Sequence, residues 1–67
     1  MIKFGERVKE LRIEKNFSQN KLGKLLNVDQ RTISSWEKGS NQPDFQTLEK
    51  LVKIFGVTAD YLLGFQD

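Results

Sequence analysis

Residues 18–39 read SQNKLGKLLNVDQRTISSWEKG, and this stretch contains the signals that begin and end two short helices. Ser18 and Asp29 are typical N-cap residues, because their side-chain oxygens accept hydrogen bonds from the first turn of a helix. Asn27 tolerates the left-handed backbone with which helices commonly end. Only three residues separate the two helices. Two short helices joined by so tight a turn form a helix-turn-helix unit, which we place at about residues 18–38.

The apolar residues of both helices recur at helical spacing, which predicts one buried side for each helix. Gly23 lies midway along the first helix, where the lack of a side chain lets the second helix approach closely at the turn. The second helix, residues 30–38, ends at Gly39. The residues expected in the core are Leu22, Leu25 and Leu26 from the first helix, and Ile33 and Trp36 from the second.

Three further helices are expected around this unit, and no stretch alternates between apolar and polar residues as a strand does. We expect these helices at residues 3–15, 45–55 and 59–63, ended by Asn16, Gly56 and Gly64, with Asp44 and Thr58 as N-caps of the last two. Their apolar sides are Phe4, Val8 and Leu11 in the first, and Phe45, Leu48, Leu51, Val52 and Phe55 in the second. The predicted fold class is all-α, a compact cluster of five helices that forms one domain over residues 1–67.

The composition narrows the class of protein. The sequence has 67 residues, a formal net charge of +2, no cysteine and no histidine. We therefore expect no disulfide, no metal and no cofactor. No apolar run approaches the length of a membrane span, and the charged N-terminus lacks the apolar stretch of a signal peptide, so a cytoplasmic protein without a membrane partner is expected. Lys and Arg outnumber Asp and Glu nine to five in residues 1–40 but are outnumbered four to two in residues 41–67. This distribution is consistent with a nucleic-acid partner without indicating one by itself.

On a helical wheel, residues 30–38 have a polar side opposite Ile33 and Trp36. Gln30 and Arg31 lie at its leading end, and these residue types pair bidentately with adenine and guanine, respectively. Since the second helix of a helix-turn-helix unit enters the major groove with its N-terminal residues at the bases, these two are the first candidates for base reading. The whole polar side consists of Gln30, Arg31, Ser34, Ser35 and Lys38, of which Lys38 is expected to reach a phosphate. The alternative is a polar side that is simply solvated, as on most surface helices.

Residues 18–39 as a whole resemble the Cro/CI-type repressors of phages and bacteria, also called XRE-like or lambda-repressor-like. The likeness extends to GERVKELR at residues 5–12 and to GVTADYLLG at residues 56–64, so it covers essentially the whole chain. Its specific parts are the Ser-Gln that opens the first helix of the unit, the Ile-Ser-x-Trp-Glu-x-Gly at the end of the second, and the Tyr-Leu-Leu-Gly ending. The resemblance implies a lambda-repressor-like DNA-binding domain.

The resemblance also implies roles for individual residues. Gln30, Arg31 and Ser35 match base-reading positions, whereas Gln19 would contact a DNA phosphate and brace the base-reading helix. Arg12 and Glu37 would form a structural ion pair between the first and third helices. The loop residues Ser40, Asn41 and Gln42 would hydrogen-bond the neighbouring phosphates, partly through backbone N–H groups. A homodimer interface would involve the last two helices, at Val57, Tyr61, Leu62 and Phe65.

Together these features predict a sequence-specific transcriptional regulator that binds double-stranded operator DNA. In the main hypothesis it is a repressor that binds a palindromic operator as a homodimer, with the third helix of each subunit in the major groove. The alternative is a protein-interaction module of the same fold, antitoxin-like or anti-repressor, with little DNA binding. An enzyme and a small-molecule substrate are not expected, because Ser34 and Ser35 have no histidine to activate them. The operator sequence, the sign of regulation and whether the chain is the N-terminal domain of a longer repressor stay open.

Overall fold

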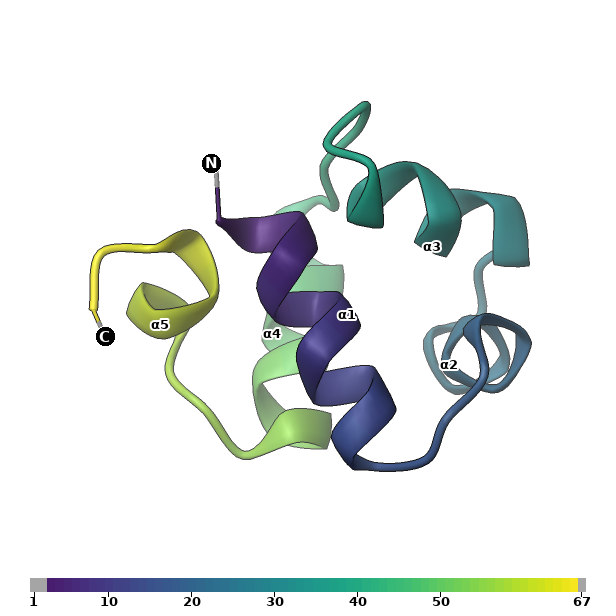
Figure 1. Cartoon of the computed structure of the whole chain (residues 1–67), viewed down its shortest axis with the longest axis horizontal. Coiled ribbons are helices and arrows are strands. Elements are labelled where there is room, and N and C mark those ends of the chain that lie inside the picture. Colours follow the sequence, from purple (N-terminus) through teal and green to yellow (C-terminus); the bar gives the residue numbers. More distant parts are fainter. Residues whose placement is uncertain (1–2, 67) are drawn as a thin grey trace.

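The computed structural model describes residues 3–66. Within them the chain forms five α-helices and no β-strand (Figure 1), at Phe4–Glu14 (α1), Gln19–Leu26 (α2), Gln30–Glu37 (α3), Phe45–Phe55 (α4) and Ala59–Leu63 (α5). All the helices predicted from the sequence are present, so the all-α fold class is confirmed. α1 is one residue shorter at each end than expected, and α3 ends at Glu37 with Lys38 as its C-cap. None of these helices is long and apolar enough to span a membrane.

Local side-chain chemistry sets where the helices begin and end. The Ser18 hydroxyl accepts a hydrogen bond of 2.9 Å from the backbone of the first turn of α2. Asp44 and Thr58 accept equivalent bonds at the starts of α4 and α5. Asn16 and Asn27 adopt φ angles of 61° and 60°, the left-handed backbone expected where α1 and α2 end. The predicted N-caps and left-handed stops are therefore confirmed together with their physical cause, although α1 and α3 are slightly shorter than predicted.

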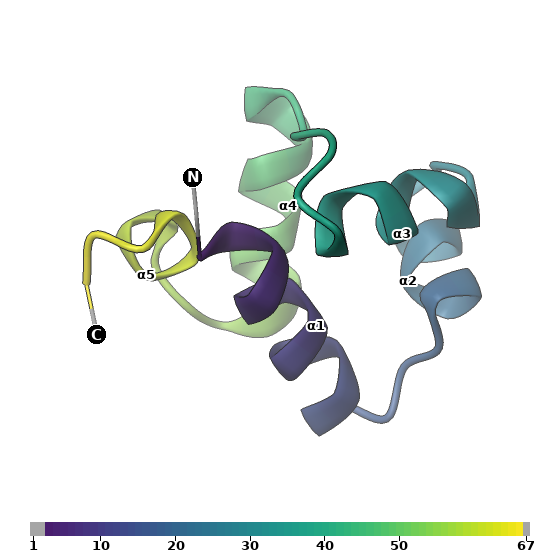
Figure 2. The same ribbon diagram turned by 45° about the horizontal axis from the view of Figure 1, so that its top comes forward.

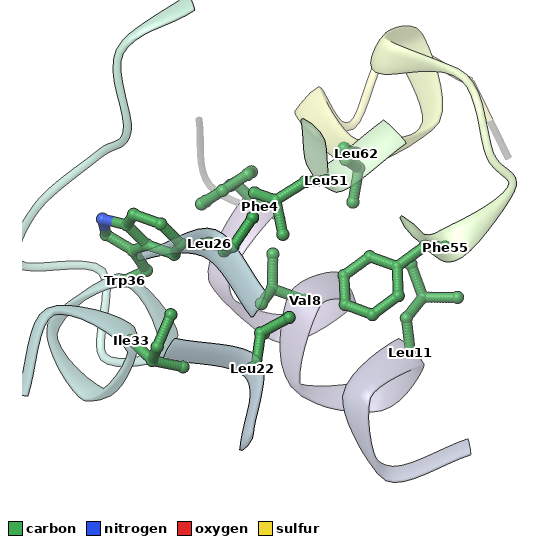
Figure 3. Packing of buried hydrophobic residues seen from close by; sticks show 10 residues of the cluster. All are labelled: Phe4, Val8, Leu11, Leu22, Leu26, Ile33, Trp36, Leu51, Phe55 and Leu62. Atoms are coloured by element: carbon green, nitrogen blue, oxygen red, sulfur yellow. The ribbon is translucent and has the colours of Figure 1, made fainter. Parts of the chain in front are cut away.

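One hydrophobic core joins all five helices (Figure 3). The ring of Trp36 in α3 packs edge-on against the ring of Phe4 in α1, with the two centroids 6.2 Å apart, which confirms the predicted core position of Trp36. Burial of this apolar surface is the main stabilising contribution in so short a chain. The core consists of Phe4, Val8, Leu11, Leu22, Leu26, Ile33, Trp36, Leu51, Phe55 and Leu62.

Two residues predicted in the core lie on the surface instead. Leu25 is 44% exposed, because the buried side of α2 is centred on Leu22, Leu26 and Gly23 and Leu25 falls beyond its edge. Phe45 is 90% exposed, because the first turn of α4 lies at the edge of the molecule, past the rim of the core (Figure 2). For these two residues the prediction from spacing alone is wrong.

Two glycines mark places where backbones come into close contact. A Cβ on Gly23 would lie 2.8 Å from the carbonyl oxygen of Val28, which confirms the predicted close approach at the turn between α2 and α3. A Cβ on Gly5 would lie 2.3 Å from the carbonyl oxygen of Trp36, so α1 and the end of α3 touch through their backbones. The second contact was not predicted from the sequence.

Candidate nucleic-acid interface

The helix α3 lies at the edge of the molecule (Figures 1 and 2), and its polar side is opposite its buried residues. Ile33 and Trp36 are buried and fix the inner side of the helix. On the outer side lies a hollow of about 280 Å³, to which Ser40 of the following loop also contributes. The hollow is lined by Gln30, Arg31, Ser34, Ser35, Lys38 and Ser40. The structure thus brings all four predicted base readers together in one place.

Hydrogen bonding is the chemistry that this hollow offers. Each lining side chain can donate a hydrogen bond, and none is a carboxylate or a large apolar group. Ser34 and Ser35 are half-buried, while the other lining residues are exposed. No cluster of possible metal ligands occurs within residues 3–66. The surface is therefore suited to the acceptor groups of base edges and phosphates.

Gln19 connects the hollow to a buried ion pair. Its Oε1 accepts a hydrogen bond from Nε2 of Gln30, and its Nε2 donates to Oε1 of Glu37 at 3.1 Å. Glu37 accepts from Nε of Arg12 at 2.7 Å and from Nη2 at 3.2 Å, with the two side chains 5% and 12% exposed. Nη1 of Arg12 also donates to the carbonyl oxygen of Phe17 at 2.9 Å. The predicted ion pair between α1 and α3 is confirmed, and its link to Gln30 through Gln19 is an addition.

Asp29 caps α3 and contacts the candidate base reader Arg31. Its Oδ1 accepts a hydrogen bond from the backbone N–H of Arg31 at 2.8 Å and lies 3.3 Å from Nε of the same residue. The backbone hydrogen bond, followed by the side-chain bond and the charge of Arg31, lowers the pKa of Asp29 below its ordinary value of 3.8. The ionised carboxylate lies at the positive end of the α3 dipole, which favours it further.

The loop after α3 carries the residues predicted to contact phosphates. Ser40, Asn41 and Gln42 are all exposed, and Ser40 lines the hollow. Oδ1 of Asn41 accepts a hydrogen bond from the backbone N–H of Gln42 at 2.9 Å. The Gln42 backbone donor is thus already engaged, which leaves the side-chain amide of Gln42 as its available hydrogen-bond donor.

Residues 8–62 match a family model described as helix-turn-helix. The chain belongs to this family. The match and the relatives, which include repressors of phages, confirm the resemblance that the sequence indicates. Over 60 residues the chain is 40% identical to the SPbeta prophage-derived HTH-type transcriptional regulator YonR of Bacillus subtilis strain 168, with 90% of this chain and 56% of YonR aligned. The chain thus spans little more than half the length of that relative.

Solved structures of helix-turn-helix proteins superpose closely on the chain. The c2 repressor of Salmonella phage P22, in complex with a synthetic operator, is 33% identical, with a TM-score of 0.87 over 94% of this chain and 96% of the repressor chain. SinR, a master regulator of biofilm formation solved in complex with DNA, is also 33% identical, with a TM-score of 0.79 over 90% of this chain and 97% of SinR. SinR has also been solved in complex with the SinI protein.

The residues predicted at a homodimer interface lie at α5 and just before and after it, on the far side of α1 from α3 (Figure 1). Val57 and Tyr61 are half-buried, and Phe65 is 78% exposed. Leu62, in contrast, is completely buried in the core of its own chain. Its side chain cannot contact a second subunit, so the prediction for Leu62 is corrected and the candidate interface of this helix-turn-helix protein is reduced to the other three residues.

Arg7 is a buried arginine that the sequence analysis did not single out. Its guanidinium group donates hydrogen bonds to the backbone carbonyl oxygens of Tyr61 and Gln66, and it lies 4.1 Å from the centroid of the Tyr61 ring. A signal for this contact was present in the sequence, because Arg7 falls between Phe4 and Val8 on the apolar side of α1. An arginine at such a position is expected to have buried partners.

Proposed function

We propose that the protein is a sequence-specific regulator of transcription that binds duplex DNA through α3. The observation that carries this proposal is the hollow on α3, which is lined by hydrogen-bond donors and left uncovered by residues 3–66. The buried side of the same helix, at Ile33 and Trp36, gives this surface a rigid support. In this proposal residues 1–67 act as one DNA-binding domain, with the helix-turn-helix unit at residues 18–38, and work in the cytoplasm.

In the proposed complex α3 lies in the major groove. Gln30 and Arg31, at its N-terminal end, read adenine and guanine, and Ser34 and Ser35 contact base edges one turn further along. Contacts to phosphates set the position of the helix in the groove and supply the part of the affinity that does not depend on sequence. The residues proposed for these contacts are Gln19, Lys38, Ser40, Asn41 and Gln42. The complexes of the P22 c2 repressor with a synthetic operator and of SinR with DNA support DNA as the partner of this fold.

The operator in this proposal is palindromic and is bound by two copies of the chain. Two-fold symmetric helix-turn-helix proteins contact half-sites about 34 Å apart, one turn of the duplex. Val57, Tyr61 and Phe65 supply the contacts between the copies, and occupancy of a promoter would repress transcription. Dimerisation doubles the length of sequence that is read, which raises specificity over that of one copy of α3.

The experiment that tests the proposal is selection of bound duplexes from a random DNA pool at one fixed salt concentration, followed by gel-shift titrations at several ionic strengths. The expected result is an enriched motif with two-fold symmetry and an affinity that falls steeply with salt. Binding that ignores sequence at every ionic strength would contradict the proposal. A protein that binds no duplex but binds another protein would instead support the interaction module.

A further inference from the structure

A chain of hydrogen bonds runs from the buried ion pair to the surface of α3. Oε1 of Glu37 accepts from Nη2 of Arg12 at 3.2 Å and from Nε2 of Gln19 at 3.1 Å, and Oε2 accepts from Nε of Arg12 at 2.7 Å. Gln19 in turn accepts from Nε2 of Gln30. The chain crosses three helices, because Arg12 lies in α1, Gln19 in α2, and Gln30 and Glu37 at the two ends of α3.

Glu37 determines which group donates and which accepts in each hydrogen bond of this network. An ionised carboxylate only accepts hydrogen bonds, so the amide of Gln19 must turn its NH₂ group toward Glu37. The oxygen of the same amide is thereby directed to Gln30, which must donate a hydrogen bond to it through its NH₂ group. A side-chain amide without such partners can rotate by half a turn and exchange its oxygen and nitrogen. Both carboxylate oxygens of Glu37 accept from the guanidinium group of Arg12, at 2.7 and 3.2 Å, which fixes the position of the carboxylate.

We infer that Glu37 is a positioning residue for base reading, which fixes the amide of Gln30 through Gln19 so that Gln30 accepts adenine and rejects guanine. The inference rests on the proposed function, in which Gln30 reads a base. With one N–H committed to Gln19, Gln30 has one N–H and its Oε1 left for DNA. Adenine presents one acceptor and one donor in the major groove and satisfies both groups. Guanine presents two acceptors, one of which would oppose Oε1.

The role of Glu37 is tested on DNA through the preference for adenine over guanine. Duplexes are first selected from a random pool by the wild-type protein, and Gln30→Ala then identifies the base pair whose preference depends on Gln30. At this base pair we expect Gln19→Met, which leaves the Arg12–Glu37 pair intact, to reduce the adenine-to-guanine affinity ratio about tenfold. Glu37→Gln is expected to do the same. Lys21→Met, a matched exposed position on α2, should weaken binding to all sequences and leave the ratio unchanged.

A second measurement follows the amide of Gln30 in the free protein by NMR. We expect its two Nε2 hydrogens to give well-separated signals in the wild type and to move toward those of the exposed Gln46 in Glu37→Gln. Within residues 3–66, Glu37 makes no direct hydrogen bond to Gln30 and reaches it through Gln19, so a purely local effect of the substitution would not move these signals.

Three results would overturn the inference. An unchanged adenine-to-guanine ratio in Gln19→Met overturns it while the proposed function stands, and this variant does not depend on the stability of Glu37→Gln. Gln30 amide signals that are the same in the wild type and in Glu37→Gln also overturn it alone. A wild-type protein that selects no sequence from the pool overturns the proposed function, and the base-reading role of Glu37 with it.

Discussion

Arg31 and Lys38 lie on the same outer side of α3 but at opposite ends of the helix. Arg31 is at the N-terminal end, which in helix-turn-helix proteins reaches the bases, and Lys38 is the C-cap. We predict that Arg31→Ala lowers the affinity for the selected operator by roughly 1–3 kcal/mol and relaxes the preference at one base pair. Lys38→Ala should weaken binding to all sequences alike. It should also reduce the slope of log affinity against log salt concentration by about 1, the contribution of one phosphate contact.

Gel-shift titrations of a panel of single-base operator variants, repeated at several salt concentrations, distinguish these two effects. Lys53→Ala removes the same charge from the last turn of α4 and serves as the control, with little expected change in affinity. Were Arg31→Ala to weaken binding to every operator variant by one common factor, Arg31 would have to be reassigned to a phosphate.

The residues of the candidate site were largely predictable, and their connections were not. On a helical wheel Arg31 stands opposite Ile33 and Trp36, and Gln30 lies on the same polar side, which requires only the spacing within one helix. The bond from Gln19 to Glu37 joins two helices, at 3.1 Å, and depends on how these helices cross. Spacing within one helix carries no information on such a crossing. The donor and acceptor directions of the hydrogen bonds from Glu37 through Gln19 to Gln30 could therefore be found only from the three-dimensional structure.

At the scale of single elements, the stabilising contribution of the Asp29 N-cap at the start of α3 should fall at low pH. The pKa of Asp29 is lower in the folded protein than its ordinary value of 3.8, chiefly through the hydrogen bond from the backbone N–H of Arg31. A lowered pKa means that the ionised form favours folding, so its contribution is complete above pH 3.8 and is lost as the pH falls through the folded pKa. We predict that the difference in unfolding free energy between the wild type and Asp29→Asn shrinks on this acidification.

The measurement for Asp29 is urea unfolding of both proteins at neutral pH and at pH values below 3.8. Asparagine keeps the capping oxygen without its charge, whereas Asp29→Ala removes both and should destabilise the fold at every pH. If the difference between the wild type and Asp29→Asn stayed constant across the whole range, the charge of Asp29 would have no part in stabilising α3.

The ends of the helices were predicted from the sequence more accurately than the residues that each helix buries. The starts and ends of the helices depend on groups a few residues apart, such as Ser18 and Asn27, so the information is local. Burial depends on what lies opposite a residue. Leu25 has the right spacing for a core residue, yet α3 packs against the Gly23 side of α2 and leaves Leu25 at the edge. Phe45 shows the same limit, because the core ends before the first turn of α4.

At the contact between α1 and α3, helix propensity and packing predict opposite changes in the unfolding free energy for one substitution, Gly5→Ala. Alanine is favoured over glycine inside a helix by about 0.5–1 kcal/mol, so Gly5→Ala would stabilise the protein if its surroundings were open. The new Cβ would instead lie 2.3 Å from the carbonyl oxygen of Trp36, which is backbone and cannot rotate away. We predict a loss of about 2 kcal/mol or more in unfolding free energy, since overpacking displaces the neighbouring helix.

Urea unfolding followed by circular dichroism measures this loss. Lys9→Ala, an exposed position on the same helix, is the control and should change the unfolding free energy by no more than about 0.5 kcal/mol. A more stable Gly5→Ala protein would show that α1 and α3 do not touch at this position.

On the scale of the whole molecule, α1 connects two surfaces with different proposed tasks. Its Arg12 belongs to the network that reaches Gln30 in α3, whereas its Arg7 holds the backbone of Tyr61 and Gln66. Thr58 adds a hydrogen bond from its hydroxyl to Oε1 of Gln66, at 2.8 Å. These contacts fix the course of the chain after α5, and thereby the position of a candidate dimer surface relative to the candidate DNA surface.

The exposed phenylalanines allow the dimer to be tested without disturbing the core. Phe65, 78% exposed, belongs to the candidate dimer surface, and Phe45, 90% exposed, lies on α4 outside it. We predict that Phe65→Ser lowers the affinity for a palindromic operator about tenfold while leaving the affinity for a single half-site unchanged, since loss of an interface aromatic weakens only the doubly bound complex. Phe45→Ser is the matched control and should leave the ratio of the two affinities as in the wild type. Gel-shift titrations with both duplexes give this ratio, and an equal loss on both in Phe65→Ser would place Phe65 outside the contact between two copies.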